Sequence, residues 1–150
     1  MARKAAAPPH EPTICTSCGA SFLRRAWRKR PLSTALLDQA TWGSCPACEQ
    51  IGRCEYYGRV IATVADIPDR DAIDRRIRNV ASRASHTQPE RRIVSIDWTG
   101  PRLELLTTSQ KLAHRVALEL AKAFGGRNSF RWSSDDGSLT AVWHPEMRRA

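Results

Sequence analysis

Two Cys-x-x-Cys pairs are the residues of this chain whose type and spacing could most readily do chemistry. Cys15 and Cys18 form the first pair, and Cys45 and Cys48 form the second. A two-residue spacer lets both sulfurs of a pair face one point, and four thiolates can surround one Zn²⁺ tetrahedrally. The 26 residues between the pairs exceed the usual ribbon spacing, but a longer loop costs little entropy. The pattern therefore predicts a zinc ribbon with one structural zinc ion.

The cysteines have alternative uses. They could be unrelated or form disulfides, and the Cys-x-x-Cys spacing also supports reversible thiol redox chemistry. A redox role is disfavoured because neither pair is expected to begin a helix that follows a strand, and because there are two pairs. A fifth cysteine, Cys54, could be a spare ligand or a reactive thiol, but we expect it to be buried, as free cysteines commonly are.

The sequence offers no positive argument for catalysis. A zinc ion bound by four thiolates has no open position for water or substrate. The four histidines, among them His114, are scattered and have no evident carboxylate or nucleophile partner. The chain contains no phosphate-binding loop, no Gly-x-Ser-x-Gly and no His-Glu-x-x-His. We therefore expect a protein that is not an enzyme.

A basic run inside the predicted ribbon is the most specific binding candidate. Guanidinium groups pair with phosphates in a bidentate manner, and an exposed indole can stack on an unpaired base. The alternative is that the tryptophan packs against the zinc module while the arginines are solvated. The candidate nucleic-acid-binding residues are Arg24, Arg25, Trp27, Arg28, Lys29 and Arg30.

Weaker basic candidates lie later in the chain. Arg75, Arg76 and Arg83 fall on the solvent side of a predicted helix, but nearby aspartates weaken their field. Arg127 and Arg131 could extend a basic surface, although the sequence does not say which face of a strand carries them.

Composition agrees with an anionic partner without requiring one. The 150 residues carry a net charge of +9, which suits nucleic acid or an acidic protein surface. Arginine accounts for 20 of the 24 basic residues, and a GC-rich genome would produce that bias without selection for binding. No segment reaches the length of a membrane span, and residues 1–10 lack the apolar core of a secretion signal. We expect a cytoplasmic protein.

Three segments follow from the patterning along the chain. Residues 1–12 form a predicted disordered basic tail, residues 13–57 the zinc ribbon, and residues 58–146 an α+β domain. Within the ribbon, residues 33–38 are expected to form one or two helical turns. Within the α+β domain we expect strands at 60–65, 92–98, 103–108, 130–133 and 139–143, with helices beginning near 69 and 109. This order matches a ferredoxin-like β-α-β-β-α-β plan with one extra strand, its helices on one face of a mostly antiparallel sheet.

The apolar faces of these elements predict the core. One helix presents Ile73, Ile77, Val80 and Ala84, and the other presents Leu112, Val116, Leu120 and Phe124. One strand is expected to present Val94, Ile96 and Trp98. Gly125-Gly126 is expected to end the second helix.

Taken together, these motifs resemble a little-characterised bacterial family of zinc-ribbon proteins. That family looks like shortened, distant relatives of the Nmd-type adaptor of the large ribosomal subunit, found in eukaryotes and archaea. The resemblance spans about residues 11–145 and rests on Glu11–Gly19, Trp27, Cys45–Cys48, Thr107-Thr108, Leu112–Arg115 and Ala123–Gly126. The chain departs from the family pattern at Gln88-Pro89, where a His-Pro is usual. The resemblance implies a cytosolic role associated with RNA or the ribosome, and no catalytic one.

Two function hypotheses follow, besides the disfavoured redox role. The first is a non-enzymatic zinc-ribbon protein that binds RNA, with ribosomal RNA as the expected partner and ribosomal proteins as further ones. The second is a protein–protein interaction module, in which the ribbon docks a partner protein and the basic charge only maintains solubility. RNA that co-purifies at low salt and dissociates at high salt would separate them.

Overall fold

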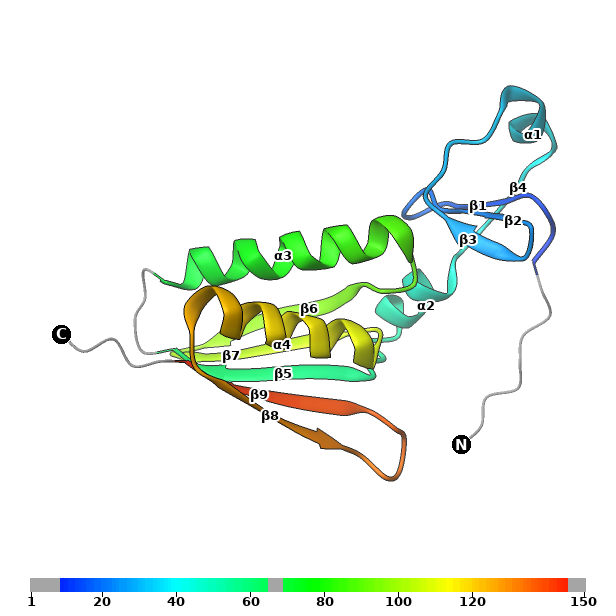
Figure 1. Cartoon of the computed structure of the whole chain (residues 1–150). Helices are drawn as coiled ribbons and strands as arrows, with labels where there is room; N and C mark the ends of the chain where they lie inside the picture. Colours follow the sequence, from blue (N-terminus) through cyan, green and yellow to red (C-terminus); the bar gives the residue numbers. More distant parts are fainter. Residues whose placement is uncertain (1–8, 65–68, 146–150) are drawn as a thin grey trace.

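The computed structural model describes residues 9–64 and 69–145. Over these residues the chain has a mixed α+β architecture with a four-stranded sheet, a five-stranded sheet and four helices. The small sheet belongs to the N-terminal part, which contains the cysteine pairs, and the large sheet belongs to the C-terminal part. Helix α2 lies between the two sheets (Figure 1).

The N-terminal part, residues 13–57, is called the ribbon module here. Its sheet has the order β3-β2-β1-β4 and consists of β1 (Thr13–Cys15), β2 (Ser21–Leu23), β3 (Ala26–Arg28) and β4 (Thr41–Gly43). Strands β1, β2 and β3 are antiparallel neighbours, whereas β1 and β4 are parallel. Helix α1 (Thr34–Gln39) confirms the predicted short helix, with the hydroxyl of Ser33 accepting from the backbone N–H of Leu36. Helix α2 (Pro46–Gly52) carries the second cysteine pair.

The predicted disordered tail differs from the structure where residues are described. Residues 1–8 lie outside the described part. The Glu11 carboxylate accepts from the backbone N–H of Arg25 at 2.6 Å, and the carbonyl of Pro12 accepts from that of Thr41 at 3.0 Å. Residues 11 and 12 are therefore held to the ribbon module, Glu11 at the turn between β2 and β3 and Pro12 at the start of β4.

The C-terminal part follows the predicted order of elements. It contains β5 (Gly58–Thr63), α3 (Asp69–Thr87), β6 (Ile93–Thr99), β7 (Arg102–Thr107), α4 (Gln110–Phe124), β8 (Arg127–Trp132) and β9 (Leu139–His144). The predicted hairpin is confirmed as β6 and β7, which are antiparallel neighbours. Both helices lie on the same face of the sheet (Figure 1), and three of its four strand pairs in the described residues are antiparallel.

The strand order departs from the simple ferredoxin-like plan. In that plan the strand following the second helix would lie beside β5. Here the order is β6-β7-β5-β9-β8, so the last strand, β9, lies beside β5 and runs parallel to it. Strand β8 is displaced to the edge and is antiparallel to β9. The extra strand is therefore inserted into the sheet and not appended at its edge.

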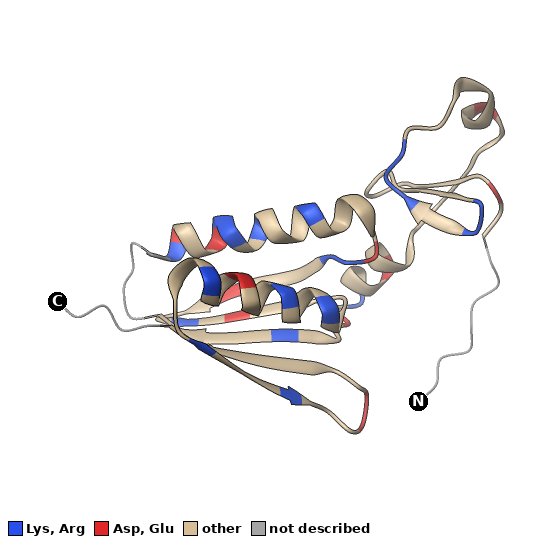
Figure 2. Cartoon of the chain, viewed as in Figure 1, with Lys and Arg blue, Asp and Glu red and all other residues tan. Residues whose placement is uncertain are grey.

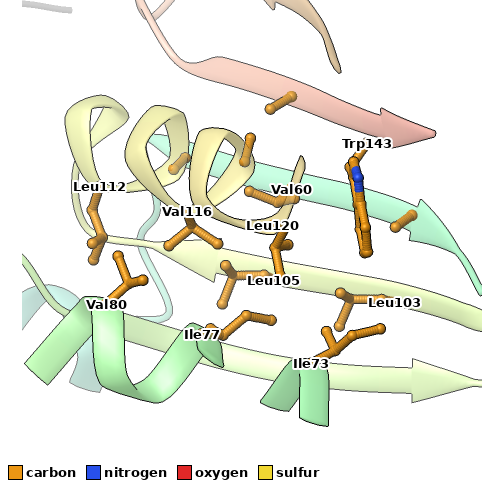
Figure 3. Close-up of a cluster of buried hydrophobic side chains, with 14 of the residues drawn as sticks. Val60, Ile73, Ile77, Val80, Leu103, Leu105, Leu112, Val116, Leu120 and Trp143 are labelled. Atoms are coloured by element: carbon orange, nitrogen blue, oxygen red, sulfur yellow. The ribbon is translucent and has the colours of Figure 1, made fainter. Parts of the chain in front are cut away.

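The main core lies between the five-stranded sheet and the two helices (Figure 3). Alternate residues of β5, β7 and β9 point to the helices, and the predicted helix faces meet them. The side chain of Trp143 is fully buried, and its indole N–H donates to the carbonyl of Gly125 at 2.9 Å. The fully buried large residues include Val60, Ile73, Ile77, Leu103, Leu105, Leu112, Val116, Leu120 and Trp143.

A β-bulge corrects the predicted face of β6. The register shifts between Ile93 and Ser95, so Ile93 and not Val94 packs against the core together with Ile96 and Trp98. An extra residue in one strand reverses the side-chain alternation before it relative to the alternation after it. The sequence prediction assumed unbroken alternation along the strand, and it therefore chose Val94 where Ile93 faces the core.

The described residues contain no helix that is long and apolar enough to cross a membrane.

Candidate metal centre

The four cysteines of the two pairs come together in one compact cluster. The sulfurs of Cys15, Cys18, Cys45 and Cys48 all lie within 4.8 Å of one another, and those of Cys18 and Cys45 are 3.7 Å apart. Four sulfurs bound to one Zn²⁺ at about 2.3 Å would lie about 3.8 Å apart in a tetrahedron. The cluster therefore fits a metal ion held by four thiolates, as the spacing predicted.

Each pair is positioned by a turn or a helix start. Cys15 ends β1, and the backbone N–H of Gly19 donates to the carbonyl of Cys15 at 3.0 Å, which folds the first pair into a knuckle. Gly19 has a φ of +78°, a conformation that glycine adopts without strain. Cys45 is the N-cap of α2, with Pro46 in the first helical turn.

The position of the second pair overturns one sequence argument. We expected neither pair to begin a helix that follows a strand, yet Cys45 and Cys48 sit at the start of α2, directly after β4. The error arose because α2 has only seven residues, too few to show an amphipathic repeat. The remaining argument against redox chemistry is that there are two pairs, and that they lie side by side in one cluster.

Backbone hydrogen bonds and burial affect the thiols differently. Burial favours a higher pKa for Cys15, but backbone hydrogen bonds from Cys18, Cys45 and Ser17 lower that pKa to about 6. Burial raises the pKa of Cys45, and the adjacent sulfurs of Cys48 and Cys18 raise it further. Neighbouring thiolates repel one another, so a cation is needed before all four ionise together.

One residue of the C-terminal part reaches the cluster. The Nη1 of Arg92 lies 3.5 Å from the Sγ of Cys48. Thr108 holds that loop, since its hydroxyl accepts from the backbone N–H of Arg92 at 2.9 Å. The carbonyl of Thr108 also accepts from Nε2 of Gln50, on α2, at 3.1 Å. The cysteine cluster is thus tied to the five-stranded sheet through α2 and the start of β6.

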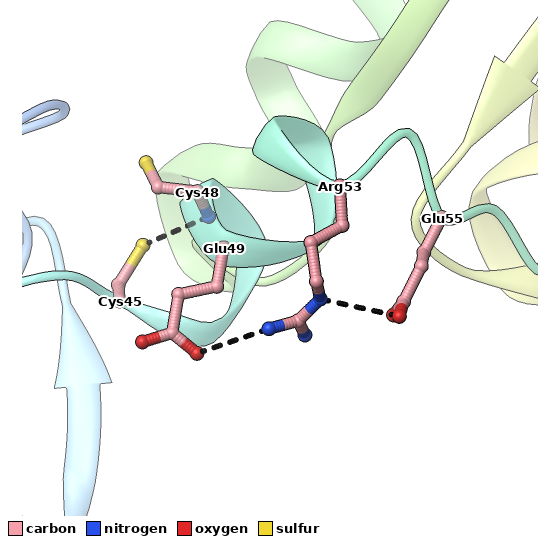
Figure 4. A network of polar contacts seen from close by, with 5 residues as sticks. All are labelled: Cys45, Cys48, Glu49, Arg53 and Glu55. Carbon is pink, nitrogen blue, oxygen red and sulfur yellow. Dashed lines mark hydrogen bonds and ion pairs between the residues drawn. The ribbon is translucent and has the colours of Figure 1, made fainter.

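The outer side of α2 carries only weak ionic contacts (Figure 4). Arg53 lies 4.0 Å from the carboxylate of Glu49 and 3.1 Å from that of Glu55. The Arg53 and Glu49 side chains are half exposed, so these pairs contribute little to stability. The cluster is therefore positioned by its backbone hydrogen bonds and by the contacts of Arg92 and Gln50.

The structure places the basic run at both ends of β3 (Figure 2). Arg24 and Arg25 form the turn between β2 and β3, both with positive φ, and Arg28, Lys29 and Arg30 are at the other end. All five are exposed. Arg24, Arg28 and Arg30 line one groove of about 190 Å³ on the ribbon module. The sequence identified these residues but could not show that three of them share a groove.

Trp27 faces away from that groove, in the arrangement given above as the alternative. Its ring packs against the cysteine cluster and lies 5.4 Å from the ring of Phe22, centre to centre. It also lines a cavity of about 400 Å³ between the ribbon module and the end of α3, together with Pro46 and Gln88. Trp27 thus anchors the hairpin that carries the arginines.

Other residues were misjudged or missed from sequence. Cys54 was expected to be buried, but it is exposed just after α2 with a φ of +53°. His114 is exposed, and its ring lies 4.8 Å from that of Phe130. Arg92 was missed because no sequence pattern links it to a cysteine 44 positions away.

The chain was compared with protein families, curated proteins and solved structures. No protein-family model, curated protein or solved structure matches the chain. The resemblance to the Nmd-type proteins therefore remains a prediction from the motifs alone.

Proposed function

We propose that this protein is a non-enzymatic zinc-ribbon protein that binds RNA in the cytoplasm, with ribosomal RNA as the expected partner. Zinc is the proposed metal because four thiolates in a closed tetrahedral set are typical of structural zinc sites. The metal would hold the ribbon module, and the ribbon module would present the arginines. No open coordination position would be left for a substrate.

The convergence of Arg24, Arg28 and Arg30 on one groove is the observation that carries this proposal. Guanidinium groups bind phosphate oxygens in a bidentate manner, and three of them on one side of a hairpin can follow consecutive phosphates. Among the described residues, no carboxylate forms an ion pair with any of the three. Their charge is therefore available to a ligand.

The hairpin is held rigidly, which favours binding. Trp27 packs on the cysteine cluster, and the Glu11 carboxylate accepts from the backbone N–H of Arg25. A segment that is ordered before binding loses less conformational entropy when the ligand arrives. The metal would contribute to RNA affinity through this anchoring, without touching the RNA.

Charge substitution tests the assignment. Replacing Arg24, Arg28 and Arg30 with alanine should weaken binding to a short fluorescent oligouridine between about 50 and 200 mM salt and flatten the salt dependence, by roughly 0.7 for each phosphate that is no longer neutralised. The control replaces Arg75, Arg78 and Arg83, exposed on α3, and removes the same charge. Both variants must retain zinc. Weaker binding confined to the α3 variant would move the binding site to α3.

The ribosomal part of the proposal needs its own test. The full-length protein should sediment with ribosomal particles at low salt and leave them as salt rises. The three-arginine variant should leave at lower salt than the native chain. Retention of the native protein that does not depend on salt would argue for a protein partner.

Docking of a partner protein is the second candidate function. It is favoured by two large apolar side chains exposed on the ribbon module, Trp42 (69% exposed) and Leu37 (48%). Tryptophan is enriched among residues that dominate protein interfaces. Replacing Trp42 with alanine would abolish partner capture under this alternative and leave RNA affinity unchanged.

A further inference from the structure

Strand β8 (Arg127–Trp132) is an edge strand with two unlike faces. Its register with β9 pairs Arg127, Ser129 and Arg131 with residues of the uncovered face of the sheet. The alternate residues Asn128, Phe130 and Trp132 pair with buried residues on the helix side. Basic and aromatic side chains thus alternate along one exposed strand, a pattern that the sequence alone did not place on either face.

The uncovered face beside β8 is suited to phosphate. Arg131 lines a hollow of about 450 Å³ together with Arg59, Ser129 and Thr140. Arg59 is paired with Glu104 at 2.6 Å. No carboxylate in the described part of the chain lies within ion-pair distance of Arg127 or Arg131. The guanidinium groups of Arg127 and Arg131 and the hydroxyls of Ser129 and Thr140 are therefore available to an anionic ligand.

The other side of β8 exposes aromatic rings at its end. Trp132 is 62% exposed and Phe130 is 39% exposed, and the ring of Phe130 lies 4.8 Å from that of His114 on α4. The side chain of Asn128 donates to the carbonyl of Ala117 on α4 at 2.9 Å and fixes the strand to the helix. The rings are thus presented on a supported strand.

The surroundings of these rings carry both basic and acidic residues. Lys111 and Arg115 are exposed on α4, and Lys111 lies one turn before His114 on the same side of the helix. Two acidic residues, Asp135 and Asp136, lie in the turn that follows β8. This charge distribution favours a polyanion that runs from Trp132 toward Arg127, away from the turn.

We propose that β8 is a second RNA-contact surface, which binds a single-stranded segment with its bases on Phe130 and Trp132 and its phosphates at Arg127 and Arg131. This inference rests on the proposed RNA-binding function and adds to it a preference for unpaired bases. Proteins that bind single strands combine a basic track with aromatic side chains, since every base has a face for stacking. An apolar protein surface would match the exposed rings but would leave the two arginines without a counter-charge.

Two double variants of the full-length protein separate stacking from charge. Replacing Phe130 and Trp132 with alanine should weaken oligouridine binding about tenfold or more with an unchanged salt slope, since stacking is not ionic. Replacing Arg127 and Arg131 with alanine should flatten the slope by about 1.4, which is 0.7 for each of the two phosphates that the arginines neutralise. Trp132→Phe should retain most of the affinity. A duplex of matching length should bind the native protein more weakly than the single strand does.

Trp42→Ala is the matched control, because it removes a similarly exposed indole from the ribbon module and should leave RNA affinity unchanged. Thermal melting shows whether each variant is folded. If the native protein binds RNA and the Phe130/Trp132 variant binds it equally well, this surface is not used and the proposed function stands. If that variant instead loses self-association with RNA affinity intact, the rings form a protein interface. If the native protein binds no RNA at low salt, both proposals fail.

Discussion

The cysteine sulfurs are held by groups that no single element supplies. The Sγ of Cys15 accepts from the backbone N–H of Cys45 at 3.3 Å, and the Sγ of Cys45 accepts from that of Cys48 at 3.4 Å. Amide donors stabilise thiolates, so the backbone on both sides of the cluster is arranged for metal binding. Removing any one sulfur removes both a ligand and part of this arrangement.

We predict one Zn²⁺ per chain. Replacing Cys15, Cys18, Cys45 or Cys48 with serine should release the metal and unfold the ribbon module, since metal binding and folding are coupled in such sites. Elemental analysis of natively purified protein measures the zinc content. Cys54→Ser is the control and should keep the metal, because that cysteine is exposed and outside the cluster. Native protein without zinc would contradict the assignment.

Arg92 should tune the metal affinity. Its guanidinium lies against Cys48 and offsets part of the negative charge that four thiolates leave on a bound Zn²⁺. Arg92→Ala should lower zinc affinity about tenfold, as substitution of a residue that supports the ligands commonly does.

Competition with a chelator measures the effect of Arg92→Ala. Arg91→Ala is the neighbouring control, because within the described residues the hydrogen bond to Cys48 comes from Arg92 and not from the Arg91 side chain. Equal affinities for the two variants would show that Arg92 serves only to position the loop.

Helix α4 is the element on which the sheet, the core and β8 all depend. Its N-cap is Ser109, whose hydroxyl accepts from the backbone N–H of Leu112 at 3.2 Å. Ser109→Ala should lower the free energy of unfolding by about 1 kcal/mol, because a backbone donor at the helix start loses its partner. Denaturant melts measure the change.

Ser33→Ala provides the matched comparison at the level of elements. Ser33 caps α1, a six-residue helix with no buried residue. The same substitution there should change global unfolding little, because α1 contributes no side chain to either core. If Ser33→Ala and Ser109→Ala lower the free energy of unfolding equally, α1 contributes as much to stability as α4 does, which would contradict this prediction.

Sequence patterning predicted most elements of the C-terminal part, for a physical reason. Long amphipathic helices and alternating strands repeat their signal, so the faces of α3 and α4 could be identified residue by residue. Short elements carry no repeat, and α2 was missed although its Pro46 is a common first helical residue. The bulge at Ile93 and the insertion of β9 beside β5 depend on tertiary pairing, which patterning does not contain.

The candidate site was also predicted only in part from the sequence. The Cys-x-x-Cys spacing identified all four cysteines of the cluster, since each pair constrains its own geometry. The groove shared by Arg24, Arg28 and Arg30 depends on the turn between β2 and β3 and on the alternation of a three-residue strand. Contacts made across the chain, such as that of Arg92, have no local signal.

At the scale of the whole molecule, the two cores are separate. The main core draws its residues from the elements between Val60 and Trp143, whereas the ribbon core consists of the cysteines and small residues around them. A fragment beginning at Tyr56 should therefore fold without the ribbon module. Far-ultraviolet circular dichroism and a cooperative thermal melt test this. An unstructured fragment would show that the Gln50 and Arg92 contacts merge the two parts into one folding unit.

The position of β9 inside the sheet has a consequence for how the chain reaches this structure. Val60 of β5 pairs with Ala141 of β9, which is synthesised 81 residues later. Until then β5 presents an open hydrogen-bonding edge, and the core lacks the ring of Trp143. Pairing between strands so distant in sequence is slow. In a nascent chain, β5 and the core therefore stay exposed until β9 has been made, and conditions that prolong this interval should favour aggregation over folding.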